Sequence, residues 1–234
     1  IRDITVRKKE LEIAARIQQR RLDVQSPLPE RVDLEVIYVP AKMISGDLFH
    51  LHKVDDHTLV GLIGDVTGKG ITAALSNSAV KVMFYESASK TANPLEIVKL
   101  LNMEVAKYLD EEYVAACCFK LDFRARKFYI VGAGINTFFF CHNDFYCWHE
   151  TVKGPSLGML PDSLFDQKVL EFFPGDRFYF YTDGITDYLD DQEILTHFKK
   201  LPTIKQQRQY LEQIIRREIA LEDDVTFIAL EIKR

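Results

Sequence analysis

The chain has 234 residues, of which 47% are hydrophobic, and its formal net charge is −5 at pH 7. That size and apolar content suffice for one large domain or two small ones with a substantial core. The acidic balance gives no general attraction to nucleic acid or to an anionic membrane, and no apolar run approaches the ~20 residues that span a bilayer. The chain begins at Ile1 on a charged stretch with no secretory signal. Because the first residue is not Met, we expect a fragment of a longer protein, with any targeting information upstream.

The first predicted element is a helix over residues 3–24 with two apolar stripes on nearly opposite sides. The stripes are Ile4, Leu11, Ala15 and Leu22, and Val6, Ile13, Ile17 and Val24. A helix that is apolar on two faces packs against two things. One is its own domain, and the other is a second subunit or an upstream coiled coil. The alternative is a helix sandwiched in the core.

After the break at residues 26–29, strands and helices alternate in blocks. Predicted strands cover residues 34–39, 48–54, 59–63, 113–121, 127–132, 137–141, 145–149, 168–173, 177–182 and 225–232. Predicted helices cover residues 71–89, 94–109, 190–199 and 203–220. Asn93 is the expected N-cap of the second helix and Pro94 its first residue. This order predicts an α+β protein, in which an antiparallel β-sandwich is flanked by helices.

The four cysteines are Cys117, Cys118, Cys141 and Cys147. They have no C-x-x-C spacing, and the adjacent Cys117 and Cys118 point to opposite faces of a strand. A zinc site or a disulfide framework is therefore not expected. We expect ordinary thiols in a reducing compartment.

Four acidic turns, each at the edge of an apolar run, carry the chemistry. They are Ser45-Gly46-Asp47, Gly64-Asp65-Val66-Thr67-Gly68-Lys69-Gly70, Thr182-Asp183-Gly184 and Glu222-Asp223-Asp224. A single turn of this kind is usually a loop or a helix cap, but four at strand ends would meet at one rim of a sandwich. Aspartates gathered in this way suit Mg²⁺ or Mn²⁺, which prefer oxygen ligands. Such a metal pair activates water against a phosphate ester.

The turn around Asp65 is the strongest candidate. Its glycines permit close approach of a ligand, and a carboxylate there could bridge two metals, with the Val66 carbonyl as a further oxygen. The spacing is neither that of a P-loop nor that of a dinucleotide fingerprint. Lys42 and Lys69 are weaker candidates for orienting a phosphate.

Taken together, these motifs resemble the metal-dependent protein phosphatases of the PPM superfamily, which are phosphatase 2C-like. The resemblance covers residues 8–234 and is greatest to the bacterial branch typified by SpoIIE and RsbU. It rests on segments 10–19, 40–47, 64–75, 154–158, 181–187 and 223–226. It implies a four-layer αββα sandwich with helices on both outer faces. We expect residues 1–25 to form a regulatory helix or linker and residues 26–234 to form the phosphatase domain.

The resemblance also implies which residues act. Two Mn²⁺ or Mg²⁺ ions would be held by Asp65, the Val66 carbonyl, Asp183 and Asp223. Asp47 would contact a metal directly or act through water, and Asp224 is the alternative to Asp223 as the last ligand. The implied catalytic residues are Asp47, Asp65, Asp183 and Asp223.

Two departures from the family pattern concern substrate contacts and metal tuning. His50 stands where a second acid often follows Asp47, and Gly134-Ile135-Asn136 replaces Gly-His-Asn. His50 and His52 lie on one strand face with His57 nearby, so the alternatives there are a zinc site and an ordinary polar strand edge.

The expected reaction is hydrolysis of phosphoserine or phosphothreonine on a protein by direct attack of water. The resemblance implies that the substrate is a STAS-type anti-anti-sigma factor in a bacterial partner-switching pathway. It also implies an upstream sensor or coiled coil, a homodimer as one option, and a cytoplasmic output domain, whose larger protein could be membrane-bound. The alternatives are a catalytically silent scaffold with the same fold and a small-molecule phosphatase.

Overall fold

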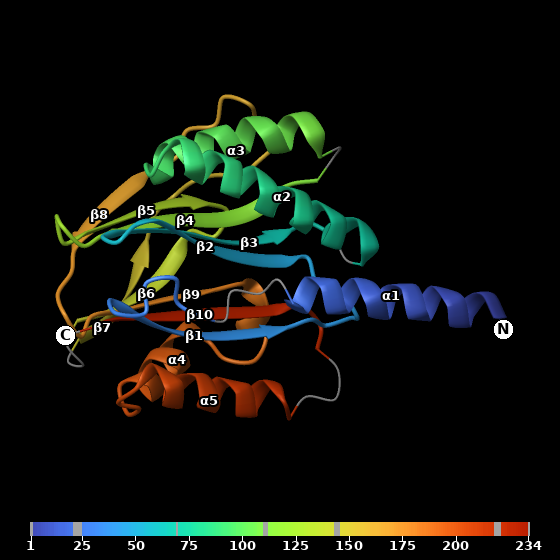
Figure 1. Cartoon of the computed structure of the whole chain (residues 1–234). Helices are drawn as coiled ribbons and strands as arrows, with labels where there is room; N and C mark the ends of the chain where they lie inside the picture. Colours follow the sequence, from blue (N-terminus) through green and yellow to red (C-terminus); the bar gives the residue numbers. More distant parts are fainter. Residues whose placement is uncertain are drawn as a thin grey trace.

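The computed structural model describes residues 2–20, 25–68, 70–109, 112–142, 146–217 and 221–233. Within them, two antiparallel sheets pack face to face (Figure 1). The first sheet has the order β1 (Val32–Val39), β10 (Val225–Ile232), β9 (Arg177–Tyr181), β6 (Thr137–His142) and β7 (Tyr146–Thr151). The second has the order β2 (Asp47–Asp55), β3 (Thr58–Val66), β4 (Val114–Asp122), β5 (Lys127–Ala133) and β8 (Gln167–Glu171).

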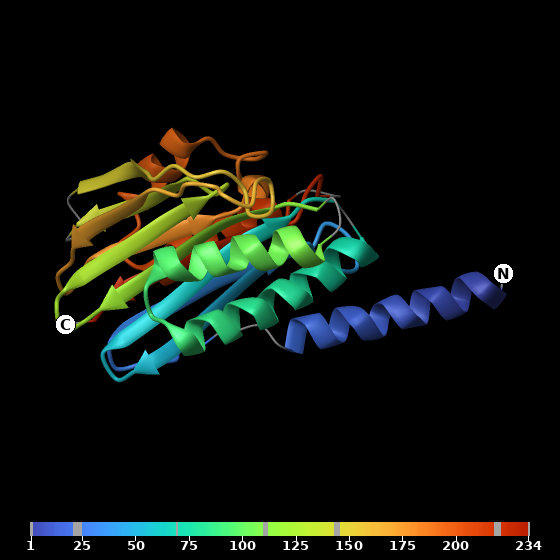
Figure 2. The same ribbon diagram turned by 90° about the horizontal axis from the view of Figure 1, so that it is seen from above.

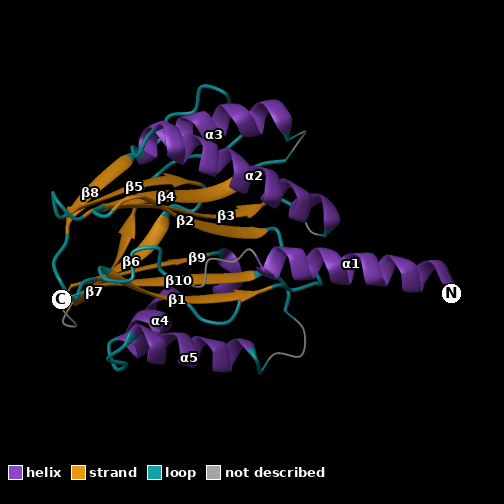
Figure 3. Cartoon of the chain, viewed as in Figure 1, coloured by secondary structure: helices purple, strands orange, loops and turns teal. Residues whose placement is uncertain are grey.

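Helices cover both outer faces of this sandwich (Figure 3). The helices are α2 (Ile71–Lys90) and α3 (Pro94–Tyr108) over the second sheet, and α4 (Asp191–Phe198) and α5 (Ile204–Ile215) over the first. A short 3-10 helix, η1 (Asp183–Ile185), follows β9. The predicted N-cap is confirmed, because the Asn93 side chain accepts a hydrogen bond from the backbone of Leu95. The predicted α+β sandwich with helices on both faces is therefore confirmed.

The space between the sheets is filled largely by phenylalanines from alternate strand positions, as expected for strands with one face in a core. Phe119 of β4 stacks on Phe180 of β9 with ring centroids 4.6 Å apart, which joins the two sheets directly. A Cβ at Gly61 would stand 2.1 Å from the ring of Phe119. Glycine at that position therefore makes room for the aromatic core.

The first helix, α1 (Arg2–Arg20), extends away from the sandwich, and its C-terminal end lies beside the domain (Figures 1 and 2). Ile13 and Ile17 are 52% and 54% exposed, so the sandwiched alternative is wrong for this stripe. An apolar groove separates α1 from α2, and Ile17 and Leu75 line it from either side. The side chains of Ile4, Val6, Leu22 and Val24 lie outside the described part.

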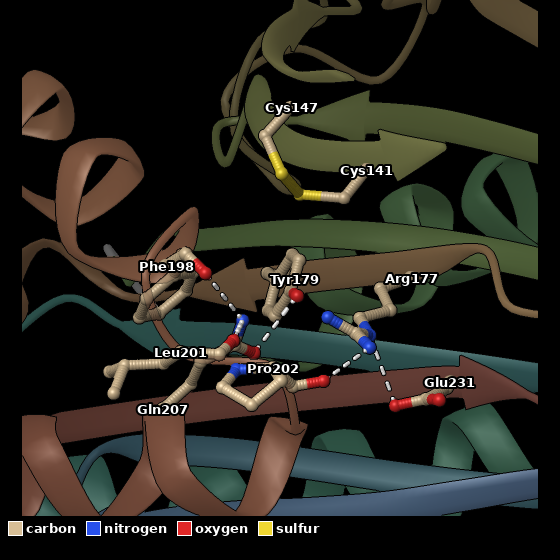
Figure 4. The surroundings of a disulfide bond; sticks show 9 residues. All are labelled: Cys141, Cys147, Arg177, Tyr179, Phe198, Leu201, Pro202, Gln207 and Glu231. Atoms are coloured by element: carbon tan, nitrogen blue, oxygen red, sulfur yellow. Dashed lines mark hydrogen bonds and ion pairs between the residues drawn. A yellow bond between two sulfur atoms is a disulfide. The ribbon is translucent and has the colours of Figure 1, made fainter. Parts of the chain in front are cut away.

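The cysteine prediction is wrong for one pair. Cys141 and Cys147 form a disulfide (Figure 4), because the β6–β7 register sets them directly opposite each other. Their spacing along the chain is unlike a C-x-x-C motif, yet the hairpin brings them together. Cys117 and Cys118 are buried free thiols, as expected.

Close to this disulfide, one buried polar side chain of α5 forms hydrogen bonds to β9 and to the end of α4. Gln207 accepts a hydrogen bond from the Tyr179 hydroxyl at 2.9 Å and donates to the carbonyls of Phe198 and Leu201 (Figure 4). Each polar atom of this buried amide thus has a partner, as burial requires.

Candidate metal centre

The strand ends bring the four predicted turns to one rim of the sandwich. Asp47 opens β2 and is the register partner of Asp65 near the end of β3. Asp183 opens η1 directly after β9, and Asp224 directly precedes β10. The turns of the first sheet touch, since a Cβ at Gly184 would stand 2.1 Å from the carbonyl oxygen of Asp224.

Two threonines of one sheet hold the buried carboxylate of the other. Asp47 is 1% exposed, and its Oδ2 accepts hydrogen bonds from the hydroxyls of Thr182 at 2.8 Å and Thr226 at 2.6 Å. The Thr182 hydroxyl also accepts a bond from the Thr226 backbone at 3.0 Å. Hydrogen bonds to a charged acceptor are among the stronger ones, so this network fixes the rim where the sheets meet.

The electrostatics show that the carboxylates act on one another. Burial, followed by the charges of Asp183, Asp223 and Asp224, raises the pKa of Asp65 to about 7. Burial and then the charge of Asp65 raise the pKa of Asp47 well above its ordinary value. Like charges at close range disfavour ionisation, and a cation among them removes that penalty.

Gly46 lies beside two oxygens that could bind a metal ion. A Cβ there would stand 3.1 Å from the Val66 carbonyl oxygen and 3.3 Å from Oδ1 of Asp65. The absent side chain thus leaves these two oxygens uncovered on that side. The donors at the rim are all oxygens, which suits Mg²⁺ or Mn²⁺. Within the described ranges, however, no three His, Cys, Asp or Glu side chains already stand close enough to form a metal-binding group. The residues fit a cation in chemical type and gather at one rim, and ligation requires them to draw closer.

The neighbours Asp223 and Asp224 differ in their contacts. Oδ1 of Asp224 accepts the backbone N–H of Ala41 at 2.7 Å, and Oδ2 accepts that of Gly46 at 2.8 Å. Both carboxylate oxygens of Asp224 therefore hold the segment before β2. Its sequence neighbour, Asp223, accepts the backbone N–H of Asp224 at 2.9 Å through Oδ1. We take Asp223 as the candidate ligand and Asp224 as a residue that holds the loop.

Comparison with known proteins decides the family. The family model described as Stage II sporulation protein E (SpoIIE) matches residues 55–233. The chain belongs to the SpoIIE family. Its curated relatives include phosphoserine phosphatase RsbU of Bacillus subtilis (strain 168), which is 31% identical over 182 residues, 77% of this chain and 54% of RsbU. Phosphoserine phosphatase RsbP of the same organism is 27% identical over 186 residues, 77% of this chain and 46% of RsbP. The chain therefore spans about half the length of these relatives.

Solved structures show the same fold at low identity. The SiaA-PP2C domain of Pseudomonas aeruginosa has a TM-score of 0.83 at 17% identity, with 98% of each chain covered. The structure titled RsbX in complex with magnesium has a TM-score of 0.72 at 22% identity, covering 87% of this chain and 96% of the other. These likenesses establish that this SpoIIE-family chain has the phosphatase 2C-like fold.

The residues that depart from the SpoIIE-family pattern make contacts other than with the four carboxylates. His50 and His52 pack on Tyr85 of α2, with ring centroids 6.3 and 5.3 Å away. The zinc alternative gains no support, because the described residues include no histidine cluster that could hold a metal. Asn136 accepts the Gly154 backbone N–H at 3.1 Å, so it ties down a loop.

Of the lysine candidates, Lys42 is exposed, and Lys69 lies outside the described residues. Sequence reasoning missed the residues that hold the acidic turns in place: Gln18, Asn77, Thr182 and Thr226. For Thr182 and Thr226 a signal existed, since they lie within three residues of the predicted ligands in TDG and DDVT.

Proposed function

We propose that the chain is a metal-dependent protein phosphatase that hydrolyses phosphoserine or phosphothreonine. The observation that carries this proposal is the meeting of the acidic turns at one rim, where Asp47 pairs with Asp65 and binds Thr182 beside Asp183. Burial and then the charges of Asp183, Asp223 and Asp224 raise the pKa of Asp65 there to about 7. Two turns from distant parts of the chain thus act on a third at one rim. The curated names of RsbU and RsbP, both phosphoserine phosphatases, support the same reaction.

Asp65, Asp183, Asp223 and the Val66 carbonyl are the proposed holders of two divalent cations, Mn²⁺ or Mg²⁺. When bound, such cations activate water and neutralise charge on phosphoryl oxygens. Asp47 has its carboxylate orientation fixed by Thr182 and Thr226. We propose that Asp47 would hold a cation either directly or through water.

Hydrolysis is proposed to proceed without a phosphoenzyme. Cys118 and Arg124 have the C-x5-R spacing of cysteine phosphatases, and this is the one sequence feature that favours a covalent route. Cys118 lies within β4 and is fully buried, and burial raises the pKa of its thiol well above the ordinary value. The nucleophile of such enzymes is a thiolate, so this cysteine is unsuited to that role.

The proposed substrate is a phosphorylated STAS-type anti-anti-sigma factor, as the family resemblance implies. Residues 1–25 would connect the phosphatase domain, residues 26–234, to a sensor or coiled coil, and the exposed stripe at Ile13 and Ile17 also suits a homodimer. We place the domain in the bacterial cytoplasm. Among the described helices, none has the length and apolar character needed to cross a membrane.

The test is Mn²⁺-dependent release of phosphate from a phosphoserine peptide and from a phosphorylated STAS protein. Activity should disappear in Asp65→Asn and Asp183→Asn, whereas exposed Asp162→Asn should retain it. A wild-type chain that binds the STAS protein but stays inert with Mn²⁺ and Mg²⁺ would favour the scaffold alternative. Turnover of small phosphate esters without turnover of either protein substrate would favour a small-molecule phosphatase.

A further inference from the structure

The segment of residues 40–46 joins β1 of one sheet to β2 of the other and ends at Asp47. It has no regular secondary structure, and side chains from elsewhere bind several of its backbone groups. Asp224 accepts the N–H groups of Ala41 and Gly46. Buried backbone groups need partners, so the position of this segment depends on the elements that supply them.

Gln18 of α1 binds Ser45 through both ends of its amide. Its Nε2 donates to the Ser45 carbonyl at 2.8 Å, and its Oε1 accepts the Ser45 N–H at 3.0 Å. A primary amide carries a donor and an acceptor side by side, so this contact requires Gln or Asn, and Asn is one carbon shorter. Gln18 thus ties the described part of α1 to the sandwich by two hydrogen bonds.

The Ser45 backbone leads directly to the candidate ligands. Its neighbour Gly46 lies against Oδ1 of Asp65 and the Val66 carbonyl. Asn77 of α2 donates to the Ser45 carbonyl at 3.3 Å and also to the Asp47 carbonyl. A shift of Ser45 must therefore move Gly46 against Asp65 or rotate the start of β2.

We propose that Gln18 is a positioning residue for the metal centre. By holding both backbone groups of Ser45, it fixes the approach of Gly46 and Asp47 to Asp65 and thereby raises the affinity of the rim for a divalent cation. Its role toward the cation rests on the proposed function. Its effect on the backbone of residues 45–47 can be measured without any metal.

The expected loss of Mn²⁺ affinity can be estimated from the two hydrogen bonds of Gln18. A net hydrogen bond contributes about 0.5–1.5 kcal/mol, and about 1.4 kcal/mol corresponds to a tenfold change in a dissociation constant. If the loss of both bonds in Gln18→Met appears fully in Mn²⁺ binding, the affinity falls roughly five- to 150-fold. We expect a loss near the lower end, about fivefold, because the other contacts of residues 40–46 remain. Methionine keeps the length and apolar stem of the side chain, which leaves the packing of α1 largely intact.

The experiment measures Mn²⁺ binding by calorimetry and amide hydrogen exchange in the metal-free protein. In Gln18→Met, exchange should accelerate at Ser45 and also at Gly46 and Asp47, whose amides Gln18 does not touch. The matched control is Arg16→Met, because Arg16 is exposed and donates to a carbonyl of its own helix. A second variant, Gln18→Glu, keeps an acceptor for the Ser45 N–H but sets a carboxylate against the Ser45 carbonyl. It should also weaken Mn²⁺ binding.

Mn²⁺ affinities within twofold of wild type for both Gln18 variants would overturn the inference and leave the proposed function intact. Faster exchange confined to Ser45 would also overturn it, since the contact would then be local. A wild-type chain that binds no Mn²⁺ would remove both proposals. Unchanged binding in Arg16→Met, together with weakened binding in both Gln18 variants, supports the inference.

Discussion

The hydroxyl of Thr226 on one sheet donates a 2.6 Å hydrogen bond to the buried carboxylate of Asp47 on the other. With the parallel bond from Thr182, it keeps the two sheets in register at the rim that carries the candidate metal centre. This contact makes Asp47 a structural link as well as a candidate functional residue.

Thr226→Val should therefore destabilise the protein and weaken Mn²⁺ binding. The substitution removes one donor from a buried carboxylate, which costs about 1–3 kcal/mol in the free energy of unfolding. Urea unfolding without metal measures this loss, and Thr151→Val on the exposed end of β7 is the control. An unfolding free energy within about 0.5 kcal/mol of wild type, the usual range for surface substitutions, would contradict this account.

Asp65→Asn should abolish phosphatase activity while stabilising the metal-free protein at neutral pH. Asn carries no charge, so it removes both the cost of burying a charge and the repulsion, which together raise the Asp65 pKa to about 7. Each pKa unit corresponds to about 1.4 kcal/mol, so the gain in unfolding free energy has an upper bound of about 4 kcal/mol. Phosphate release in the presence of Mn²⁺ checks the loss of activity. Differential scanning calorimetry with EDTA and with Mn²⁺ checks the change in stability: Mn²⁺ should raise the Tm of wild type and leave that of Asp65→Asn nearly unchanged. A metal-free variant less stable than wild type would contradict the repulsion.

The raised pKa of Asp65 also makes the stability of the metal-free protein depend on pH. The folded pKa of Asp65, about 7, lies above the ordinary value of 3.8, so between these values the folded protein holds a proton that the unfolded chain has lost. Stability then falls as pH rises through this window. The Tm of metal-free wild type minus that of Asp65→Asn should therefore decrease as pH rises from 3.8 toward 7. A difference that stays constant would show that Asp65 has an ordinary pKa.

The sequence predicted the acidic rim because strand ends and turn residues are local signals. The boundaries of β10, from Val225 to Ile232, agree with the prediction, and the motif order already placed Asp65 at a strand end. The distinction between Asp223 and Asp224 was out of reach, because it depends on the backbone of Ala41 and Gly46 more than 170 residues away. No periodicity reports a contact of that kind.

The sequence-based prediction missed the Cys141–Cys147 disulfide for a different reason. The predicted hairpin already set these residues on neighbouring strands, but the prediction weighed their spacing along the chain instead of their position across the ladder. The predicted strands already contained the two cysteines, and the register of β6 and β7 sets them opposite each other so that the disulfide forms.

Reduction of that disulfide should lower stability without removing activity. The cross-link closes a short loop, with the cysteines six residues apart, and a loop of that size contributes about 2 kcal/mol. Dithiothreitol should therefore lower the Tm of wild type and leave that of Cys141→Ser/Cys147→Ser unchanged. A wild-type Tm that does not respond to the reductant, with free thiols confirmed by mass spectrometry after alkylation, would show that the cross-link adds no stability.

Gly184→Ala should damage the candidate centre without changing any candidate ligand. A Cβ at this position would stand 2.1 Å from the Asp224 carbonyl oxygen and 3.3 Å from Cγ2 of Val225, so the turn after β9 must separate from the turn before β10. Because these turns carry Asp183 and Asp223, we expect weaker Mn²⁺ binding, lower activity and a lower Tm. Calorimetric titration with Mn²⁺ gives the first readout, and exposed Asp187→Ala, three residues along the chain, controls for a nonspecific effect on this segment. Mn²⁺ affinity equal to wild type in Gly184→Ala would mean that the two turns do not need this close contact to bind a cation.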